Sequence, residues 1–136
     1  MITQKYINDI AFKIIGCAVE VQKEMGPGLL ESVYEDCFIK ELQDAGLKVE
    51  FQKQVPLYYK GELLKRKLRL DLLVEDLIII DNKSVSAIIP LDKAKLLTYL
   101  KLSNKLKGLI INFNSLNVTK NTVSLVTKKF LELPLE

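Results

Sequence analysis

The chain has 136 residues, enough for one domain with a sizeable core, and its 49% hydrophobic and 27% charged residues are typical of a globular protein. It contains no histidine, which excludes Ser-His-Asp and Cys-His catalysis and any histidine-containing zinc site. A net charge of +3 is too small to identify a nucleic-acid-binding protein by itself, so the distribution of the charges has to decide.

Helical periodicity covers the first third of the chain. Apolar residues recur at helical spacing over residues 4–24, and the glycines and proline of 26–28 then impose a turn. A second helix is expected over about 30–45, with Gly46 as its cap. Within it, Ser32-x-x-Glu35 has the spacing of a capping box, which would place the start of the helix two or three residues later.

The period then changes to that of β-strands. Residues 49–60 predict an extended segment, and Pro56 places it at an edge or a bulge. Over the first part of residues 63–75, Leu64, Leu68 and Leu70 fall on one face and Lys65, Lys67, Arg69 and Asp71 on the other, and the Glu75-Asp76 pair predicts a short turn. The β-branched run 77–81 that follows is typical of a buried central strand.

The last third of the chain predicts a crossover back into the same sheet. Pro90 opens a helix that ends near Asn104, and residues 106–114 form an apolar strand after it. A shorter strand is expected near 123–127. The order ααβββαβ, without a linker, predicts a single α/β domain over 1–136, with a central mixed sheet of about four strands flanked by α-helices.

Two further features bear on the cellular context. Cys17 and Cys37 are too few for a disulfide framework or a four-thiolate zinc site, so we expect small buried thiols in a reducing compartment. The N-terminus lacks a signal-peptide pattern, and no apolar run is long enough to span a membrane. The expected location is cytoplasmic, with no membrane partner.

Three charged residues lie inside or next to apolar strands: Asp71, Asp81 and Lys83. Asp81 and Lys83 are two positions apart on one strand and leave it by the same face, and hairpin pairing would bring Asp71 beside Asp81. Two such carboxylates repel each other unless a cation lies between them, and oxygen ligands suit Mg²⁺ or Mn²⁺. The alternative is an ion pair at a strand end, which contributes little energy.

A second motif, GLLESVY over residues 28–34, reads G-x-x-E-x-x-Y. Together with LRLDLLVED, the Asp81-x-Lys83 pair and AKLLTYLK, it resembles the bacterial family named for GxxExxY, within the PD-(D/E)XK nuclease superfamily. The resemblance extends from about residue 10 to residue 114 and rests on four motifs in order. It implies a nuclease-like fold and a Mg²⁺-dependent or Mn²⁺-dependent hydrolase acting on nucleic acid, DNA or RNA.

The resemblance also implies roles for individual residues. Asp71 and Asp81 match metal-binding carboxylates, with Glu31 in support, and Lys83 matches the lysine that positions the nucleophile or the scissile phosphate. Tyr99 matches the tyrosine of a QxxxY element on the following helix. The alternatives are that Glu31 serves only to stabilise a helix N-terminus, and that Tyr99, like Tyr34, is a packing residue.

Four basic residues are candidates for substrate binding. Lys95 stands where QxxxY has glutamine, and there it either clamps a phosphate or weakens cation binding. Lys65, Lys67 and Arg69 alternate on the strand face that also carries Asp71, so they form a basic row leading to the proposed metal. The alternative for this row is an edge strand whose lysines deter aggregation.

Three functions remain open from the sequence. The first is a metal-dependent phosphodiesterase acting on DNA or RNA. The second is a catalytically weak or inactive module that retains the nuclease fold for nucleic-acid binding or assembly, for which Lys95 is the best argument. The third is a protein-interaction domain that uses its helical face.

Overall fold

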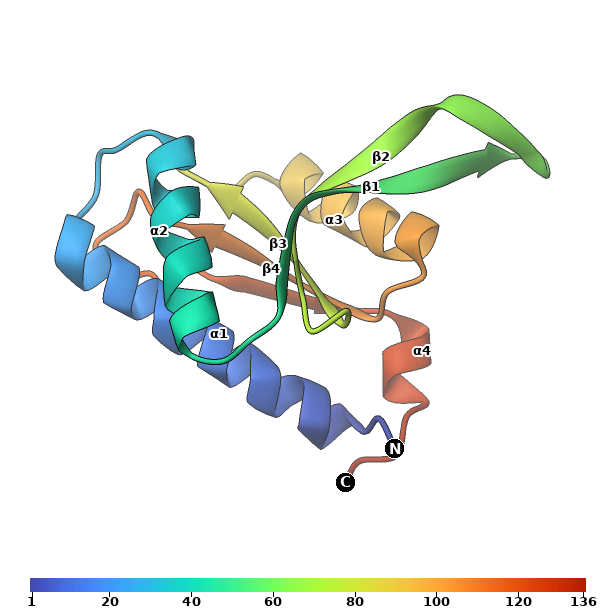
Figure 1. Ribbon diagram of the computed structural model, residues 1–136, viewed down its shortest axis with the longest axis horizontal. Helices are drawn as coiled ribbons and strands as arrows, with labels where there is room; N and C mark the ends of the chain where they lie inside the picture. The colour runs from blue at the N-terminus through green and yellow to red at the C-terminus, as the bar shows by residue number, and fades with distance from the viewer.

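The computed structural model describes residues 1–136 as one five-stranded mixed sheet with helices on both faces (Figure 1). The strands lie in the order β1-β2-β3-β4-β5, antiparallel except for the parallel pair β3 and β4. The elements are α1 (Gln4–Met25), α2 (Glu31–Asp44), β1 (Val49–Tyr59), β2 (Glu62–Val74), β3 (Ile78–Lys83), α3 (Pro90–Ser103), β4 (Lys107–Asn112), β5 (Val123–Val126) and α4 (Lys128–Leu131).

The predicted α/β fold class is confirmed, and most predicted elements lie within a residue or two of their expected ends. The parallel crossover through α3 is the one expected from a strand, a helix and a second apolar strand. The sheet has five strands rather than about four, because β5 joins it at the edge beyond β4. The short helix α4 was not predicted, since four residues give no readable period.

Two details at the ends of α2 differ from the sequence predictions. The helix begins at Glu31 with Leu30 as N-cap, and Ser32 lies inside the first turn, so the predicted capping box is wrong. The C-cap is Ala45, and Gly46 follows it with a φ of 83°. Glycine is therefore needed one position beyond the cap, where the chain turns into the left-handed region.

The core consists of two layers, one on each face of the sheet. The larger layer packs α1 and α2 against one face and includes Ile14, Tyr34, Phe38, Leu72 and Ile80. The smaller layer packs α3 against the other face and includes Leu70, Leu73, Ile79, Leu96 and Ile110. Apolar residues on both faces of β3 are thus buried, as its β-branched sequence predicted.

Tyr34 fixes the turn that precedes α2. Its hydroxyl donates to the Gly26 carbonyl at 2.5 Å and accepts the Leu29 N–H at 3.0 Å, while its ring stacks on Phe113 with centroids 5.0 Å apart. Gly28 has a φ of 97°, a backbone conformation that is strained for any residue with a side chain. The glycine and the tyrosine of G-x-x-E-x-x-Y therefore set the position of α2, and the packing interpretation of Tyr34 is confirmed.

Both cysteines are free, with Cys17 buried and Cys37 half-buried in the two N-terminal helices. No helix combines the length and the apolar character that crossing a membrane requires. The two ends of the chain meet, because the backbone N–H groups of Gln4 and Lys5 donate to the carbonyls of Pro134 and Leu135 (Figure 1).

Candidate active site

Strand β2 bends at Asp71. Its pairing with β3 stops at Leu72, and the side-chain alternation reverses there: Leu72 lies under α1 and α2, whereas Leu68 and Leu70 lie under α3. Opposite the bend, Gln52 of β1 has a φ of 50°, outside the range of a regular strand. Such irregularities re-aim a side chain, and here they leave Asp71 at the point where β2 separates from β3.

The bend brings Asp71 and Asp81 together. The Asp71 carboxylate accepts the backbone N–H of Asn82 at 3.0 Å, which ties it to β3 beside Asp81. Burial raises the pKa of Asp81 to about 6; the Lys83 and Lys95 charges oppose this rise, while repulsion from Asp71 and a hydrogen bond with it add to it. The hairpin thus gives the predicted pair of neighbouring carboxylates, of which Asp81 is only 14% exposed.

Lys83 is held between two carboxylates. Its Nζ lies 3.5 Å from Asp81 and 3.6 Å from Asp92, and all three side chains are mostly buried. Asp92 also accepts the Ile89 N–H at 2.9 Å, so it caps the start of α3 while it holds the lysine. Burial by itself lowers the pKa of Lys83, but Asp81 and Asp92 outweigh that effect and the net pKa is raised.

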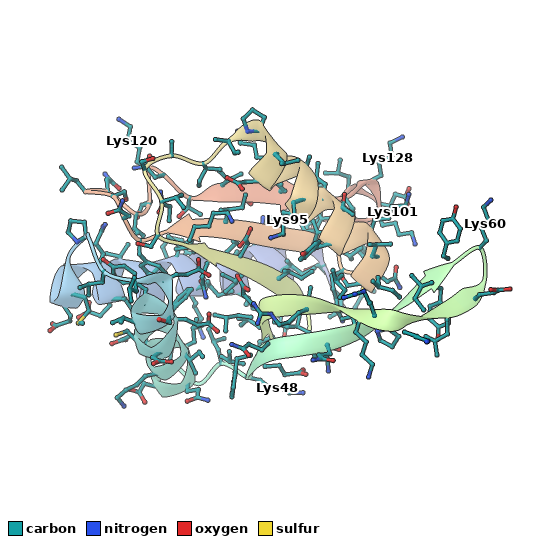
Figure 2. All side chains as sticks on the ribbon, turned by 90° about the horizontal axis from the view of Figure 1, so that it is seen from above. Lys48, Lys60, Lys95, Lys101, Lys120 and Lys128 are labelled. Atoms are coloured by element: carbon teal, nitrogen blue, oxygen red, sulfur yellow. The ribbon has the colours of Figure 1, made fainter.

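A cavity of about 200 Å³ opens beside the two aspartates, between β2, β3 and α3. Its charged and hydroxyl-bearing lining residues are Lys67, Arg69, Asp71, Asp81, Lys95 and Tyr99. The Lys95 Nζ lies 5.2 Å from the centroid of the Tyr99 ring, within the range of a cation–π contact. Figure 2 shows Lys95, a residue of α3, over the middle of the sheet.

Helix α2 adds two more carboxylates near Asp71. Burial raises the pKa of Glu31, with a further rise from the Asp71 charge, and the same two causes in the same order raise the pKa of Glu35 one helical turn later. Glu31 is exposed and Glu35 half-buried. The Asp71 charge therefore affects the pKa of both glutamates of α2, although the sequence assigned Glu35 only a capping role.

The structure brings together most of the predicted site residues. Six of them line the cavity or its rim, and Lys83 joins them through its contact with Asp81. Lys65 lies farther along β2, away from the cavity lining, so the basic row reaches the aspartates through Lys67 and Arg69. Asp92 was missed because its contact with Lys83 joins a helix start to a strand end, which no local spacing reveals.

The site's chemistry can be compared with that of a divalent-cation site. No group of three or more His, Cys, Asp or Glu side chains is arranged to hold a metal ion. Mg²⁺, however, commonly binds through one or two carboxylates together with waters and substrate phosphates. Asp71 and Asp81 supply two neighbouring oxygen donors whose mutual repulsion a cation relieves, so this pair fits a weakly held hard cation.

The comparison with protein families agrees with this geometry. The model of the PD-(D/E)XK nuclease superfamily matches residues 8–125, so the chain belongs to that superfamily. Membership links it with nuclease activity in general, with nucleic acid as substrate, and with the divalent metals that such nucleases typically use. Neither a curated protein nor a solved structure matches the chain.

Proposed function

We propose that this protein is a Mg²⁺-dependent or Mn²⁺-dependent nuclease that hydrolyses phosphodiester bonds in DNA or RNA, and that residues 1–136 act as one domain of this kind. The observation that carries the proposal is the meeting of Asp71 and Asp81 at the bend of β2, with Lys83 beside them. We further place the chain in the GxxExxY family, on its Gly28, Glu31 and Tyr34 motif.

In this proposal Asp71 and Asp81 hold the cation, and Glu31 supports them by binding waters that surround the cation. The bound cation supplies Lewis-acid stabilisation of the phosphate and lowers the pKa of a water. Glu31 suits an outer role because it is exposed and because its charge is already coupled to that of Asp71.

Lys83 supplies fixed positive charge. Its raised pKa keeps the ammonium group protonated at neutral pH, so it acts as a hydrogen-bond donor to a phosphate oxygen rather than as a base. Tyr99 lies on the cavity wall, and its hydroxyl donates a hydrogen bond to the same substrate. Lys95, Lys67 and Arg69 on the cavity wall, with Lys65 beyond it, bind the flanking phosphates.

A second candidate is a nucleic-acid-binding module without turnover. It is favoured by Lys95, an ammonium group in the cavity that already opposes the negative charge of Asp81 and Glu31. In that case the Lys95 ammonium group, instead of a bound cation, balances part of the negative charge of the aspartates. The absence of a three-carboxylate group is the second observation on this side.

One experiment separates the two. Mn²⁺ is titrated by calorimetry into the wild type, Asp71→Ala and a control, Asp36→Ala, which removes an exposed carboxylate elsewhere on α2. Cleavage of mixed DNA and RNA substrates is followed in parallel. The nuclease proposal requires Mn²⁺ binding and cleavage in the wild type and the control, with cleavage at least about 10²-fold lower in Asp71→Ala. Nucleic-acid binding without Mn²⁺ binding or cleavage supports the second candidate.

A further inference from the structure

The distal part of the β1–β2 hairpin forms an arm that leaves the body of the molecule. We define the arm as residues 53–69. Its base still packs under α3 through Val55 and Leu68, while its outer part projects past α3 with Lys60 at the outer end (Figures 1 and 2). All six residues from Glu62 to Lys67 are exposed, so this segment is held mainly by its pairing with β1 and no helix covers it. An isolated two-stranded hairpin is marginally stable in water, which makes an external partner the simplest reason for its length.

The charge of the chain is concentrated in this arm. It carries six basic residues and one acidic residue, a net charge of +5, whereas the rest of the chain has 14 basic and 16 acidic residues and is net negative. The basic residues are Lys53, Lys60, Lys65, Arg66, Lys67 and Arg69. Such a concentration of positive charge matches a polyanion.

The tip of the arm adds exposed apolar and aromatic surface. Tyr58 and Tyr59 are each 63% exposed, and Leu63, which lies opposite Tyr58 across the hairpin, is 65% exposed. The Lys60 ammonium lies 5.5 Å from the centroid of the Tyr59 ring. The basic residues along the arm can contact phosphates, and the aromatic and apolar residues at its tip can make apolar contacts.

We infer that the arm is a ribbon that lies along the major groove of duplex DNA while the Asp71–Asp81 site faces the phosphate backbone. The inference rests on the proposed function and names its substrate class. An antiparallel two-stranded ribbon fits the wide major groove of B-form DNA, whereas the deep, narrow major groove of A-form RNA excludes it. Single strands offer no groove.

The reach of the arm agrees with this geometry. From Asp71 to the tip, β2 covers nine residues, which at roughly 3.3 Å per residue is about 30 Å. One turn of B-form DNA is about 34 Å long, so the tip and the aspartates bracket nearly one turn. The basic residues between them are spaced to meet phosphates along that distance.

Association of two copies through this edge is the weaker alternative. β1 is an edge strand, but Pro56 has no N–H to offer and the register shifts between Pro56 and Tyr58. Bulges, proline and lysine are the features that prevent edge-to-edge pairing. The net charge of +5 also makes two arms repel each other.

The inference predicts an order of affinities that anisotropy measurements in EDTA can test. The substrates are a DNA duplex of two turns, the same sequence as an RNA duplex, and its single strand. The wild type is expected to bind the DNA duplex about tenfold more tightly than the other two. Methyl green, which occupies the major groove, should displace the protein, and netropsin, which occupies the minor groove, should not.

Two pairs of variants assign the binding to the arm. Tyr58→Ala with Leu63→Ala should weaken duplex binding about tenfold without changing its salt dependence. Lys65→Gln with Lys67→Gln should lower the salt slope by about two. The matched controls are Phe12→Ala with Leu116→Ala, and Lys128→Gln with Lys129→Gln, all at exposed positions outside the arm. These controls should bind like the wild type.

The contrary outcomes are distinguishable. Equal affinity for duplex and single strand, or tip variants that bind like the wild type, would overturn the ribbon while leaving the nuclease proposal intact. A wild type that binds no nucleic acid overturns both. If the tip variants change the oligomeric state in light scattering and leave DNA affinity unchanged, the arm is an interface between copies and the inference is wrong.

Discussion

The two halves of strand β2 show how one strand serves two purposes. From Leu72 to Val74 every side chain is buried in a paired, central part of the sheet, while from Glu62 to Lys67 every side chain is exposed. Asp71 lies between the halves, where pairing with β3 ends. The rigid half fixes the aspartate, and the free half extends its surface toward a ligand, so stability and binding should respond to different substitutions along one strand.

The largest effect should separate the two halves directly. Leu72→Ala removes a fully buried side chain from the core under α1 and α2, and should lower the free energy of unfolding by about 2–5 kcal/mol. Leu63→Ala, at an exposed position of the same strand, should change it by less than about 0.5 kcal/mol. Urea unfolding measures both, and similar losses in the two variants would contradict the comparison.

The pH dependence of stability tests whether Asp81 is buried beside Asp71 at the bend of β2. In metal-free buffer the folded-state pKa of Asp81 is raised to about 6 from an ordinary value of 3.8, so the folded state holds this proton more tightly. The resulting stability is fully present below pH 3.8 and is lost as the pH rises through about 6.

Asp81→Asn removes this titration. Relative to the wild type, the variant should therefore gain stability between pH 4 and pH 7, by on the order of 2 kcal/mol. Thermal or urea unfolding of both proteins across this range gives the difference. A difference that stays constant with pH would show that Asp81 is not held in the buried, repelled state described above.

Substitution of Asp92 tests whether the start of α3 holds Lys83 in position. Asp92→Asn weakens the cap of α3 and removes one of the two carboxylates that hold Lys83, so we expect a loss of about 1 kcal/mol in stability. It should also reduce cleavage about tenfold through a misplaced Lys83. Asp92→Glu keeps a carboxylate that can also cap α3, so it should restore part of the activity if positioning is the cause. A loss of stability in Asp92→Asn with cleavage unchanged would assign Asp92 to the cap alone.

The smallest effect concerns Lys95. If its charge suppresses cation binding, Lys95→Gln should raise Mn²⁺ affinity severalfold, since Lys95 opposes the charge of Asp81 across the cavity. If it clamps a phosphate, the same change should instead lower nucleic-acid affinity and reduce the salt slope by about one. We expect the first result, and no change in either measurement would leave Lys95 as a solvated side chain.

The sequence by itself determined all the elements except α4, and it placed Asp81 and Lys83 on one face of their strand. Helical and strand periods are local properties: the spacing of Ile7, Ile14 and Val21 alone defines the buried face of α1. The period of two likewise places Asp81 and Lys83 on one face of β3. Asp71 comes near Asp81 because three residues, 75–77, connect β2 to β3, and the register that starts with Val74 opposite Ile78 leads toward Asp71 opposite Asp81.

Only the tertiary structure decided the bend and the partners across the sheet. The reversal at Asp71 depends on Gln52 of the neighbouring strand and on helices packed against opposite faces, none of which the sequence of β2 contains. Asp92 meets Lys83, and Glu35 senses Asp71, through contacts between segments that are distant along the chain. The exposure of the arm was undetermined for the same reason, because alternation predicts two faces but only packing decides which of them is covered.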